Sequence, residues 1–396
     1  MEPVLLLNHY LKFYIDMMWE TEHSQIMTNY IHTYRNKATK IVGLLRHRNK
    51  HAKQNVNHNV WLHQYHEHVF FQLFRLRKNT FYILLQELIK YDRFCLIRKK
   101  YRGGNYPTDP EKCLLIFLWY LGHQDTLHGI ADRFGVVSST VMNIVNIFLY
   151  ITNLLKTKYI VWPKNQEEFD YIVSGFKNYP GVVGAVDGCH INVTVPESQH
   201  ESYADRYQQH SINLMGICSS GKIFTYVFIG YPGSAHDSRV FSASPLVSYI
   251  QRYGSQKFFP TPEHHLIGDS AFPLKQWIMT PFKKHNNLSS IEKRHNYLLS
   301  ADRVCIENAF GILKGRFRRL KFINCYSISK SVEIISASCV LHNFCYINHD
   351  KWTTEFEDNK QTIEDGVLHR DFDRQQFALG KEKRGRIANI LSNNVI

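Results

Sequence analysis

The chain has 396 residues, of which 44% are hydrophobic, 14% aromatic and 21% charged, an ordinary mixture for a globular protein with a sizeable core. This composition argues against global disorder, a collagen-like repeat and a coiled coil. The formal net charge is +14 at pH 7, and a basic surface of this size attracts polyanions such as nucleic acids.

Residues 1–105 are predicted to form a helical N-terminal region. Their apolar run Val4–Leu7 is too short for a signal peptide, and no window of the chain approaches the roughly 18 consecutive apolar residues that a membrane span requires. We therefore expect no membrane association. Three nearby histidines raise the question of a metal site, namely His63, His66 and His68. Zinc sites usually add cysteines or a second ligand pair, so a solvated helix face is the better interpretation.

Apolar residues at helical spacing predict two short helices between Phe70 and Lys90, with a break near Asn79. A basic run, Arg98–Arg102, follows and leads into a loop that contains two glycines. Such a run is typical of a nuclear import signal or of a phosphate-binding strip, and a solvated turn explains it equally well.

Residues 106–160 are predicted to contain a helix-turn-helix that binds DNA. Ile130 and Phe134 lie one turn apart, and Gly135 can take the positive φ that a tight turn between helices requires. Ser138 is a favoured N-cap for the second helix. The polar face of that helix offers side chains for phosphates or base edges, namely Ser139, Thr140, Asn143 and Asn146. An ordinary helical hairpin is the alternative, and the net positive charge favours DNA contact.

Residues 175–348 change to short β-rich segments followed by helix, which predicts a mixed α/β domain. Strands are expected at 181–187, 190–195, 211–218, 222–230 and 264–269, and helix is expected again from 300 to 347. Residues 349–396 are predicted to form a polar tail with a basic helix around Lys381–Leu391.

The eight cysteines are scattered through apolar stretches and form no Cys-x-x-Cys pair. A disulfide scaffold needs dense spacing in a short secreted chain. We therefore predict buried thiols in a reducing compartment.

Two acidic residues, Asp187 and Asp269, each stand where a short apolar strand is predicted to end. A third acid, Glu307, lies on a predicted helix, where the 3.6-residue period places Arg303 and Lys314 on the same stripe. An acid framed by two cations suits a site that must hold both a metal and phosphates.

This set of residues suits phosphodiester cleavage, which at neutral pH needs an activated water and a stabilised leaving oxygen. Two Mg²⁺ ions about 3.5–4 Å apart supply both, and Mg²⁺ prefers oxygen ligands. We predict that three carboxylates are catalytic and bind Mg²⁺ or Mn²⁺, with the first bridging the ions: Asp187, Asp269 and Glu307. Three cations are predicted to contact phosphates, namely Arg303, Lys314 and Arg316.

Another acid competes with Asp269 for the second position. Asp237 follows His236 after the third β-rich region and is predicted to begin a helix, where Asp is a good N-cap. Placement at a strand end favours Asp269. His236 and Asp237 are then expected to be neighbours of the site.

Short sequence blocks occur in a characteristic order between residues 181 and 343. They are Gly184–Ile191, Asp205–Arg206 with His210–Asn213, Tyr231–Gly233 with His236–Ser238, Gly268–Pro273, Glu307–Gly311 with Arg316–Phe317, and Leu341–Asn343. In this order they resemble the PIF/Harbinger transposases and the nucleases domesticated from them. The resemblance implies an RNase H-like mixed sheet flanked by helices, with a DDE triad that maps onto Asp187, Asp269 and Glu307.

The resemblance further implies a transposase-derived DNA endonuclease with a two-metal mechanism that uses Mg²⁺ or Mn²⁺. It implies DNA as a partner, a Myb/SANT-like partner protein that assists targeting, and a location in the nucleus, with the cytoplasm and a homo-oligomer left open. Two alternatives also stay open: a catalytically silent domesticated protein that binds DNA or a partner, and an intact Harbinger element transposase.

Overall fold

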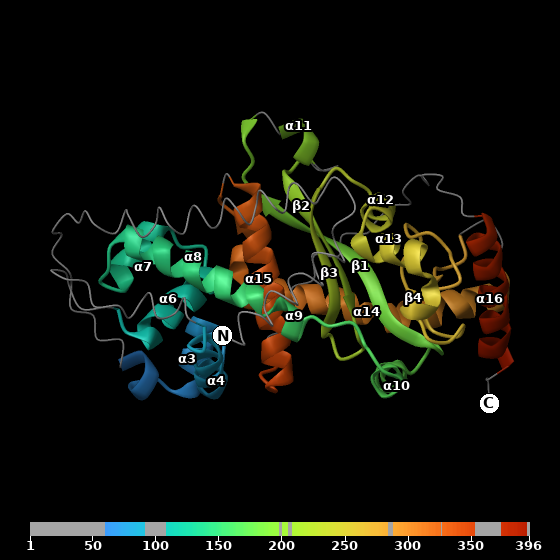
Figure 1. Cartoon of the computed structure of the whole chain (residues 1–396), viewed down its shortest axis with the longest axis horizontal. Coiled ribbons are helices and arrows are strands. Elements are labelled where there is room, and N and C mark those ends of the chain that lie inside the picture. The colour runs from blue at the N-terminus through green and yellow to red at the C-terminus, as the bar shows by residue number, and fades with distance from the viewer. Residues whose placement is uncertain are drawn as a thin grey trace. The chain divides into compact units, whose positions relative to one another are not determined.

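In the computed structural model, six strands form one mixed sheet (Figure 1). They are β1 (Val182–Val193), β2 (Ser211–Cys218), β3 (Phe224–Pro232), β4 (His265–Ile267), β5 (Ile278–Met279) and β6 (Phe322–Ile323). The order across the sheet is β3–β2–β1–β4–β5, and β6 also pairs with β1. The pairs β1–β2 and β2–β3 are antiparallel. The pairs β1–β4, β1–β6 and β4–β5 are parallel. This confirms the predicted α/β fold, an RNase H-like mixed sheet with flanking helices.

The structure describes residues 60–91, 108–197, 200–204, 208–283, 288–325, 327–352 and 374–393. These residues belong to one compact unit, Asn55–Ile396. The predictions for residues 1–59 and for the basic run Arg98–Arg102 lie outside the described residues.

Strand β1 is one continuous strand, whereas the sequence pattern predicted two strands, 181–187 and 190–195. Gly188 does not interrupt the strand because β2 pairs with it without a break from Ala185 to Asn192. Tertiary pairing therefore overrides the turn signal that a glycine next to an aspartate gives in isolation.

Two hydrophobic cores cover the two faces of the sheet. One face of β1, through Ala185 and Ile191, shares a core with α14 (Ser290–Arg316) and α15 (Ile328–Ile347). The other face, through Val186, shares a second core with α12 (Asp237–Ser242) and α13 (Pro245–Tyr253). The alternation of side chains along a strand explains how one strand supplies both cores.

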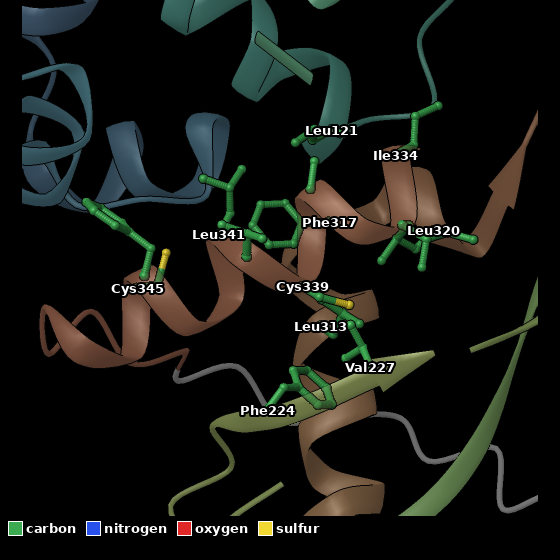
Figure 2. Packing of buried hydrophobic residues seen from close by; sticks show 14 of the residues in the cluster. Leu121, Phe224, Val227, Leu313, Phe317, Leu320, Ile334, Cys339, Leu341 and Cys345 are labelled. Atoms are coloured by element: carbon green, nitrogen blue, oxygen red, sulfur yellow. The ribbon is translucent and has the colours of Figure 1, made fainter. Parts of the chain in front are cut away.

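Figure 2 shows the first core from close by, with side chains of β3, α14 and α15 in contact. The residues from these elements include Phe224, Val227, Leu313, Cys339 and Leu341, and Phe317, which follows the end of α14, joins them. Asn343 of α15 also fixes the start of β3, because its Oδ1 accepts from Phe224 N at 2.9 Å and its Nδ2 donates to Phe224 O at 2.7 Å. This explains why a polar residue in the block Leu341–Asn343 is completely buried.

The described part of the chain that precedes β1 is helical, as predicted for residues 1–105 and 106–160. Its elements are η1 (Val60–Gln64), α3 (Glu67–Phe74), α4 (Lys78–Leu88), α6 (Pro110–Gly122), α7 (Leu127–Arg133), α8 (Ser138–Leu154), α9 (Lys156–Tyr159) and α10 (Gln166–Gly175). The break between the first two α-helices begins at Arg75, which takes a φ of 66° at the C-cap of α3, and not near Asn79, which lies inside α4. In the part of the chain that the structure describes, no single helix is long and apolar enough to cross a membrane; α7 and α8 meet that test only as a pair.

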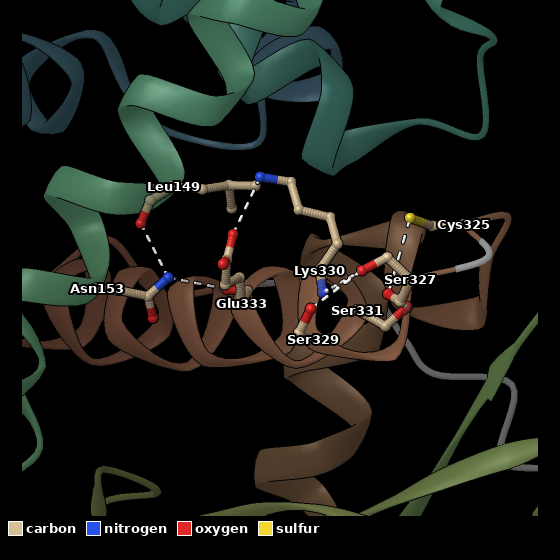
Figure 3. A network of polar contacts seen from close by, with 8 residues as sticks. All are labelled: Leu149, Asn153, Cys325, Ser327, Ser329, Lys330, Ser331 and Glu333. Carbon is tan, nitrogen blue, oxygen red and sulfur yellow. Dashed lines mark hydrogen bonds and ion pairs between the residues drawn. The ribbon is translucent and has the colours of Figure 1, made fainter. Parts of the chain in front are cut away.

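Helix α8 is joined to α15 by polar contacts as well as by apolar packing (Figure 3). The Nδ2 atom of Asn153 donates to Leu149 O at 2.9 Å and to Glu333 O at 3.1 Å. The C-terminal half of α8 is thereby fixed to the helix layer of the sheet.

Helix α14 has 27 residues and begins with a capping box, in which Ser289 and Glu292 each accept a hydrogen bond from the other's backbone N–H. The remaining elements are α11 (His200–Tyr203), η4 (Ser255–Lys257), η5 (Arg318–Lys321) and α16 (Arg374–Asn393). The predicted basic helix around Lys381–Leu391 lies within α16. It packs on α14 and β5, and its Lys383 Nζ donates to the carbonyl oxygens of Pro262, His264 and Gln276.

The described cysteines are free thiols, and most of them are buried as predicted. The buried ones are Cys113, Cys189, Cys218, Cys339 and Cys345, whereas Cys305 and Cys325 are partly exposed. Cys95 lies outside the described residues.

Candidate active site

The candidate site lies along one edge of β1. On this side β4 pairs with Val182–Ala185, and β6 pairs with Asn192–Val193. No described strand covers the stretch between these two pairings. Asp187 lies at the beginning of this uncovered stretch, two residues beyond the last pairing with β4. The edge of the sheet is therefore open where the first predicted catalytic acid stands.

Asp269 lies beside Asp187 because of the register of two parallel strands. Ala185 pairs with Ile267; Asp187 stands two residues further along β1, and Asp269 stands two residues beyond the end of β4. Neighbouring strands are about 4.8 Å apart, and residues two positions apart face the same side of a sheet. We therefore place both carboxyl groups level with each other on the α14 face. The Ala271 N–H donates to Asp269 Oδ1 at 3.0 Å, which orients that side chain.

Helix α14 brings the third acid to this edge. Arg303 donates from one nitrogen to Asp187 Oδ2 at 2.9 Å and from the other to Glu307 Oε1 at 2.5 Å. The helical stripe predicted for Arg303 and Glu307 is present, and it faces β1. A single guanidinium thus joins a buried carboxylate on the sheet to Glu307, which is 48% exposed.

Two acids of the candidate site, Asp187 and Asp269, have raised pKa values. Burial raises the pKa of Asp187 to about 7, the charge of Arg303 opposes this rise, and the charges of Asp269 and Asp237 add to it. The pKa of Asp269 is also raised, first by burial and then by Asp237. Carboxyl groups whose pKa is raised by burial and by a neighbouring negative charge are a physical mark of a functional site.

Asp237 belongs to the same cluster, although the sequence pattern made it only a neighbour. It is the first residue of α12, and His236 is the N-cap, so the predicted capping role of Asp237 is wrong. Its Oδ1 instead accepts from Asn213 Nδ2 at 3.0 Å. His236 is exposed at the surface.

The two other residues predicted to contact phosphate, Lys314 and Arg316, differ in their exposure. Lys314 is partly exposed and donates from Nζ to His190 O at 2.8 Å, so it lies against the uncovered stretch of β1. Arg316 is completely buried, where it pairs with Asp350 and donates to Arg75 O at 2.8 Å. The prediction that Arg316 contacts phosphate is wrong in this structure, because a side chain without exposed surface that is already bonded to a carboxylate cannot reach DNA.

The predicted helix-turn-helix has the expected geometry. Helices α7 and α8 are bent by 103° relative to each other, within the range of about 90–120° for such motifs. Gly135 takes a φ of 58°, as predicted, and Ile130 and Phe134 are buried. The predicted N-cap is shifted by one residue: Val137 is the N-cap and Ser138 is the first residue of α8. Ser139 is exposed, and the other polar residues of that face are partly exposed, namely Thr140, Asn143 and Asn146.

The carboxylates fit a divalent cation by their chemistry, since Asp and Glu oxygens are the ligands that Mg²⁺ and Mn²⁺ prefer. Among the described residues, no group of three or more His, Cys, Asp or Glu side chains is already arranged to hold a metal ion. At the candidate site Arg303 lies between Asp187 and Glu307 and pairs with both. His63, His66 and His68 are all exposed, in agreement with the predicted solvated face.

The sequence pattern missed how two residues, the partly exposed Gly188 and the buried Asn213, shape this site. Gly188 lies against the carboxylate of Asp237, and Asn213 binds it. Both residues occur in the sequence blocks quoted above. The available signal was a glycine and an amide inside strands that are otherwise apolar, but the contact joins separate elements and has no sequence periodicity.

Residues 186–343, which include most of β1, all of α14 and most of α15, match the family of DDE superfamily endonucleases. The chain is similar to the proteins named "Putative nuclease HARBI1" from Bos taurus, with 37% identity over 46% of this chain and 50% of that protein, and from Homo sapiens, with 34% identity over 52% and 60%. It is also similar to "Protein ALP1-like" from Arabidopsis thaliana, with 26% identity over 77% and 74%.

These matches confirm the resemblance to Harbinger-derived nucleases. The matched part of the chain spans about half the length of the first of these relatives. No solved structure matches the chain.

Proposed function

We propose that the protein is a transposase-derived DNA endonuclease that cleaves phosphodiester bonds at the edge of β1. The observation that carries this proposal is the convergence of three acids from separate parts of the fold: Asp187 lies on β1, Asp269 follows the adjacent strand β4, and Glu307 is joined to Asp187 through Arg303. The matches to a DDE endonuclease family and to proteins named as nucleases support it.

Asp187, Asp269 and Glu307 would hold Mg²⁺ or Mn²⁺. When bound, such ions activate a water and stabilise the oxygen that leaves the phosphorus. Arg303 favours the ionised form of Asp187 and orients both this carboxylate and that of Glu307. Its planar guanidinium also matches the geometry of a phosphate. Lys314, anchored at His190 O beside the acids, adds positive charge for the DNA backbone.

We further propose that α8 contacts the DNA through Ser139, Thr140 and Asn143. Their exposure at the N-terminal end of the second helix supports this role, since that end of a recognition helix meets base edges in known complexes. A nuclear location, a Myb/SANT-like partner protein and a homo-oligomer remain part of the proposal, and they rest on the resemblance alone.

A second candidate function is a catalytically silent protein that binds DNA. The observation that favours it is the position of Arg303, which occupies the space between Asp187 and Glu307. In this alternative the arginine replaces the cation permanently and the acids only stabilise the fold.

The two candidates differ in a nicking assay. Supercoiled plasmid is incubated with the full chain in Mg²⁺, in Mn²⁺ and in EDTA, with and without a candidate partner protein. We expect nicking that requires the cation and falls at least a hundredfold in Asp187→Asn and Glu307→Gln. Asp170→Asn, which removes an exposed charge on α10, is the matched control and is expected to keep full activity.

Circular dichroism must show that the variants are folded. Nicking that is unchanged in both Asp187→Asn and Glu307→Gln excludes the assignment of these acids. A wild-type chain that binds DNA without nicking it under any condition supports the silent alternative.

A further inference from the structure

Helices α12 and α14 lie on opposite faces of the sheet. Val240 of α12 belongs to the core that contains Val186, whereas Ile306 of α14 belongs to the core that contains Ala185. A side chain from α12 can therefore reach the acids of the site only by passing close to the backbone of β1. Asp237, at the first position of α12, does this.

Gly188 makes this approach feasible because it has no side chain. A Cβ atom at this position would lie 2.1 Å from Asp237 Oδ1 and 2.7 Å from its Cγ. The carboxyl group of Asp237 therefore rests directly on the backbone of the residue that follows Asp187. This contact places the carboxyl group of Asp237 against the residue next to Asp187 on β1.

Asn213 of β2 holds Asp237 in this position through its Nδ2 atom, while its Oδ1 atom has no hydrogen-bond partner. Asn213 is completely buried, and its Nδ2 donates to Asp237 Oδ1 at 3.0 Å. The Oδ1 of the same amide is buried without a hydrogen-bond partner. A buried acceptor without a donor destabilises a fold, and so do carboxylates that repel one another. A hydrated cation relieves both, because its charge neutralises the acids and its water molecules donate hydrogen bonds.

We propose that Asp237 is a further cation-binding carboxylate of the active site, which reaches the site from the opposite face of the sheet, and that Asn213 positions it. Asn213 holds Oδ1 of Asp237, and Oδ2 is the ligand oxygen. This inference rests on the proposed nuclease function. The competing explanation is a structural clamp, in which the contact between Asn213 and Asp237 only fixes α12 to β2.

The replacement Asp237→Asn separates these explanations, because an asparagine keeps an oxygen that can accept from Asn213 and loses the charge. Mn²⁺ binding to the full chain without DNA is measured by electron paramagnetic resonance of free Mn²⁺. Thermal unfolding is followed by circular dichroism in EDTA and in Mn²⁺. Asp187→Asn is the positive control, and Asp170→Asn is the control for loss of one charge elsewhere.

We expect Mn²⁺ binding to be about tenfold weaker in Asp237→Asn, with a melting temperature in EDTA at or above that of the wild type and a smaller increase on adding Mn²⁺. A loss of less than threefold, with binding impaired in Asp187→Asn, overturns the role of Asp237 and leaves the nuclease proposal intact. A wild-type chain that binds no Mn²⁺ overturns both. If Asp237→Asn does not fold, Asp237→Ser is measured with the same criteria.

Discussion

Arg303 and Arg316 lie on the same helix, and each is paired with an aspartate, yet they occupy different environments. The side chain of Arg303 is 17% exposed and lies between Asp187 and the half-exposed Glu307. Arg316 and Asp350 are both 0% exposed, and Arg316 also donates to two backbone carbonyls. The first arginine lies at an open edge of the sheet, where a ligand can compete for its partners. The second is enclosed and holds separate parts of the chain together.

The difference shows how the energetic role of an ion pair depends on its burial. A buried pair is costly to break because the remaining charge has neither a partner nor water. At the edge of β1, exchange of Arg303 for a cation leaves each carboxylate with a partner. We therefore expect the same chemistry to serve as an anchor at one end of α14 and, in the proposed nuclease, as an exchangeable contact nearer its middle.

The largest expected effect comes from breaking the anchor. Arg316→Ala leaves Asp350 buried and unpaired, and it also removes the donor to Arg75 O, which connects α14 to the end of α3. We expect the free energy of unfolding to fall by about 3–5 kcal/mol. Urea denaturation of the purified chain measures this loss. Arg318→Ala, at an exposed position two residues further on, is the matched control and is expected to change it by less than about 0.5 kcal/mol.

A loss below about 1 kcal/mol in Arg316→Ala would contradict the role of this pair as an anchor. Equal losses in Arg316→Ala and Arg318→Ala would show that the burial of Arg316 has no special energetic weight.

Much of this contrast follows from helix periodicity in the sequence. The 3.6-residue period correctly places Arg303 and Glu307 on one stripe. The same period turns Arg316 by roughly 200° from Lys314, so a stricter use of periodicity would have removed Arg316 from the predicted phosphate contacts. Periodicity cannot show which partner a buried cation has. Asp350 lies in the segment predicted as a polar tail, and its burial depends on tertiary contacts.

The strands show the same division between local and long-range information. Apolar runs correctly indicated the β-rich region and the position of Asp269 just beyond the end of β4, but the predicted strand end at Asp187 is wrong, because Asp187 lies inside β1. They did not show that β1 continues through Gly188, because only pairing with β2 decides this. The contact between Asp237 and Gly188 joins residues from opposite layers. No local pattern encodes such a contact.

The next largest effect concerns the ion pair of Arg303 and Asp187, in which burial raises the pKa of Asp187. The folded chain keeps a proton on Asp187 up to a pKa of about 7, against an ordinary value of 3.8. Between these values the folded state binds more protons than the unfolded state, so the free energy of unfolding falls as the pH rises. We expect Asp187→Asn, measured in EDTA at pH 8, to raise the free energy of unfolding by less than the roughly 4 kcal/mol that about three pKa units of about 1.4 kcal/mol each would give, because the substitution also removes a charged partner of Arg303.

Urea denaturation at pH 5 and at pH 8 tests this expectation. The stability difference between the two pH values should be smaller in Asp187→Asn than in the wild type. Glu307→Gln, at an exposed position, is expected to leave the pH dependence nearly unchanged. If Asp187→Asn shows the same dependence as the wild type, the buried carboxyl group does not destabilise the folded state.

The smallest expected effect repeats the comparison within α8, where two asparagines serve different purposes. Asn153 is bonded to Glu333 O of α15 and anchors the helix, whereas Asn143 lies on the polar face near its N-terminal end. We expect Asn143→Ala, combined with Thr140→Ala, to weaken binding of duplex DNA about tenfold, or about 1.4 kcal/mol, without a change in melting temperature. Asn153→Ala should lower the free energy of unfolding by about 1 kcal/mol and leave DNA binding unchanged.

Fluorescence anisotropy at fixed ionic strength, together with thermal unfolding, measures both properties. Unchanged DNA binding in the double variant would make α7 and α8 an ordinary helical hairpin, because a recognition helix without its polar contacts must lose affinity.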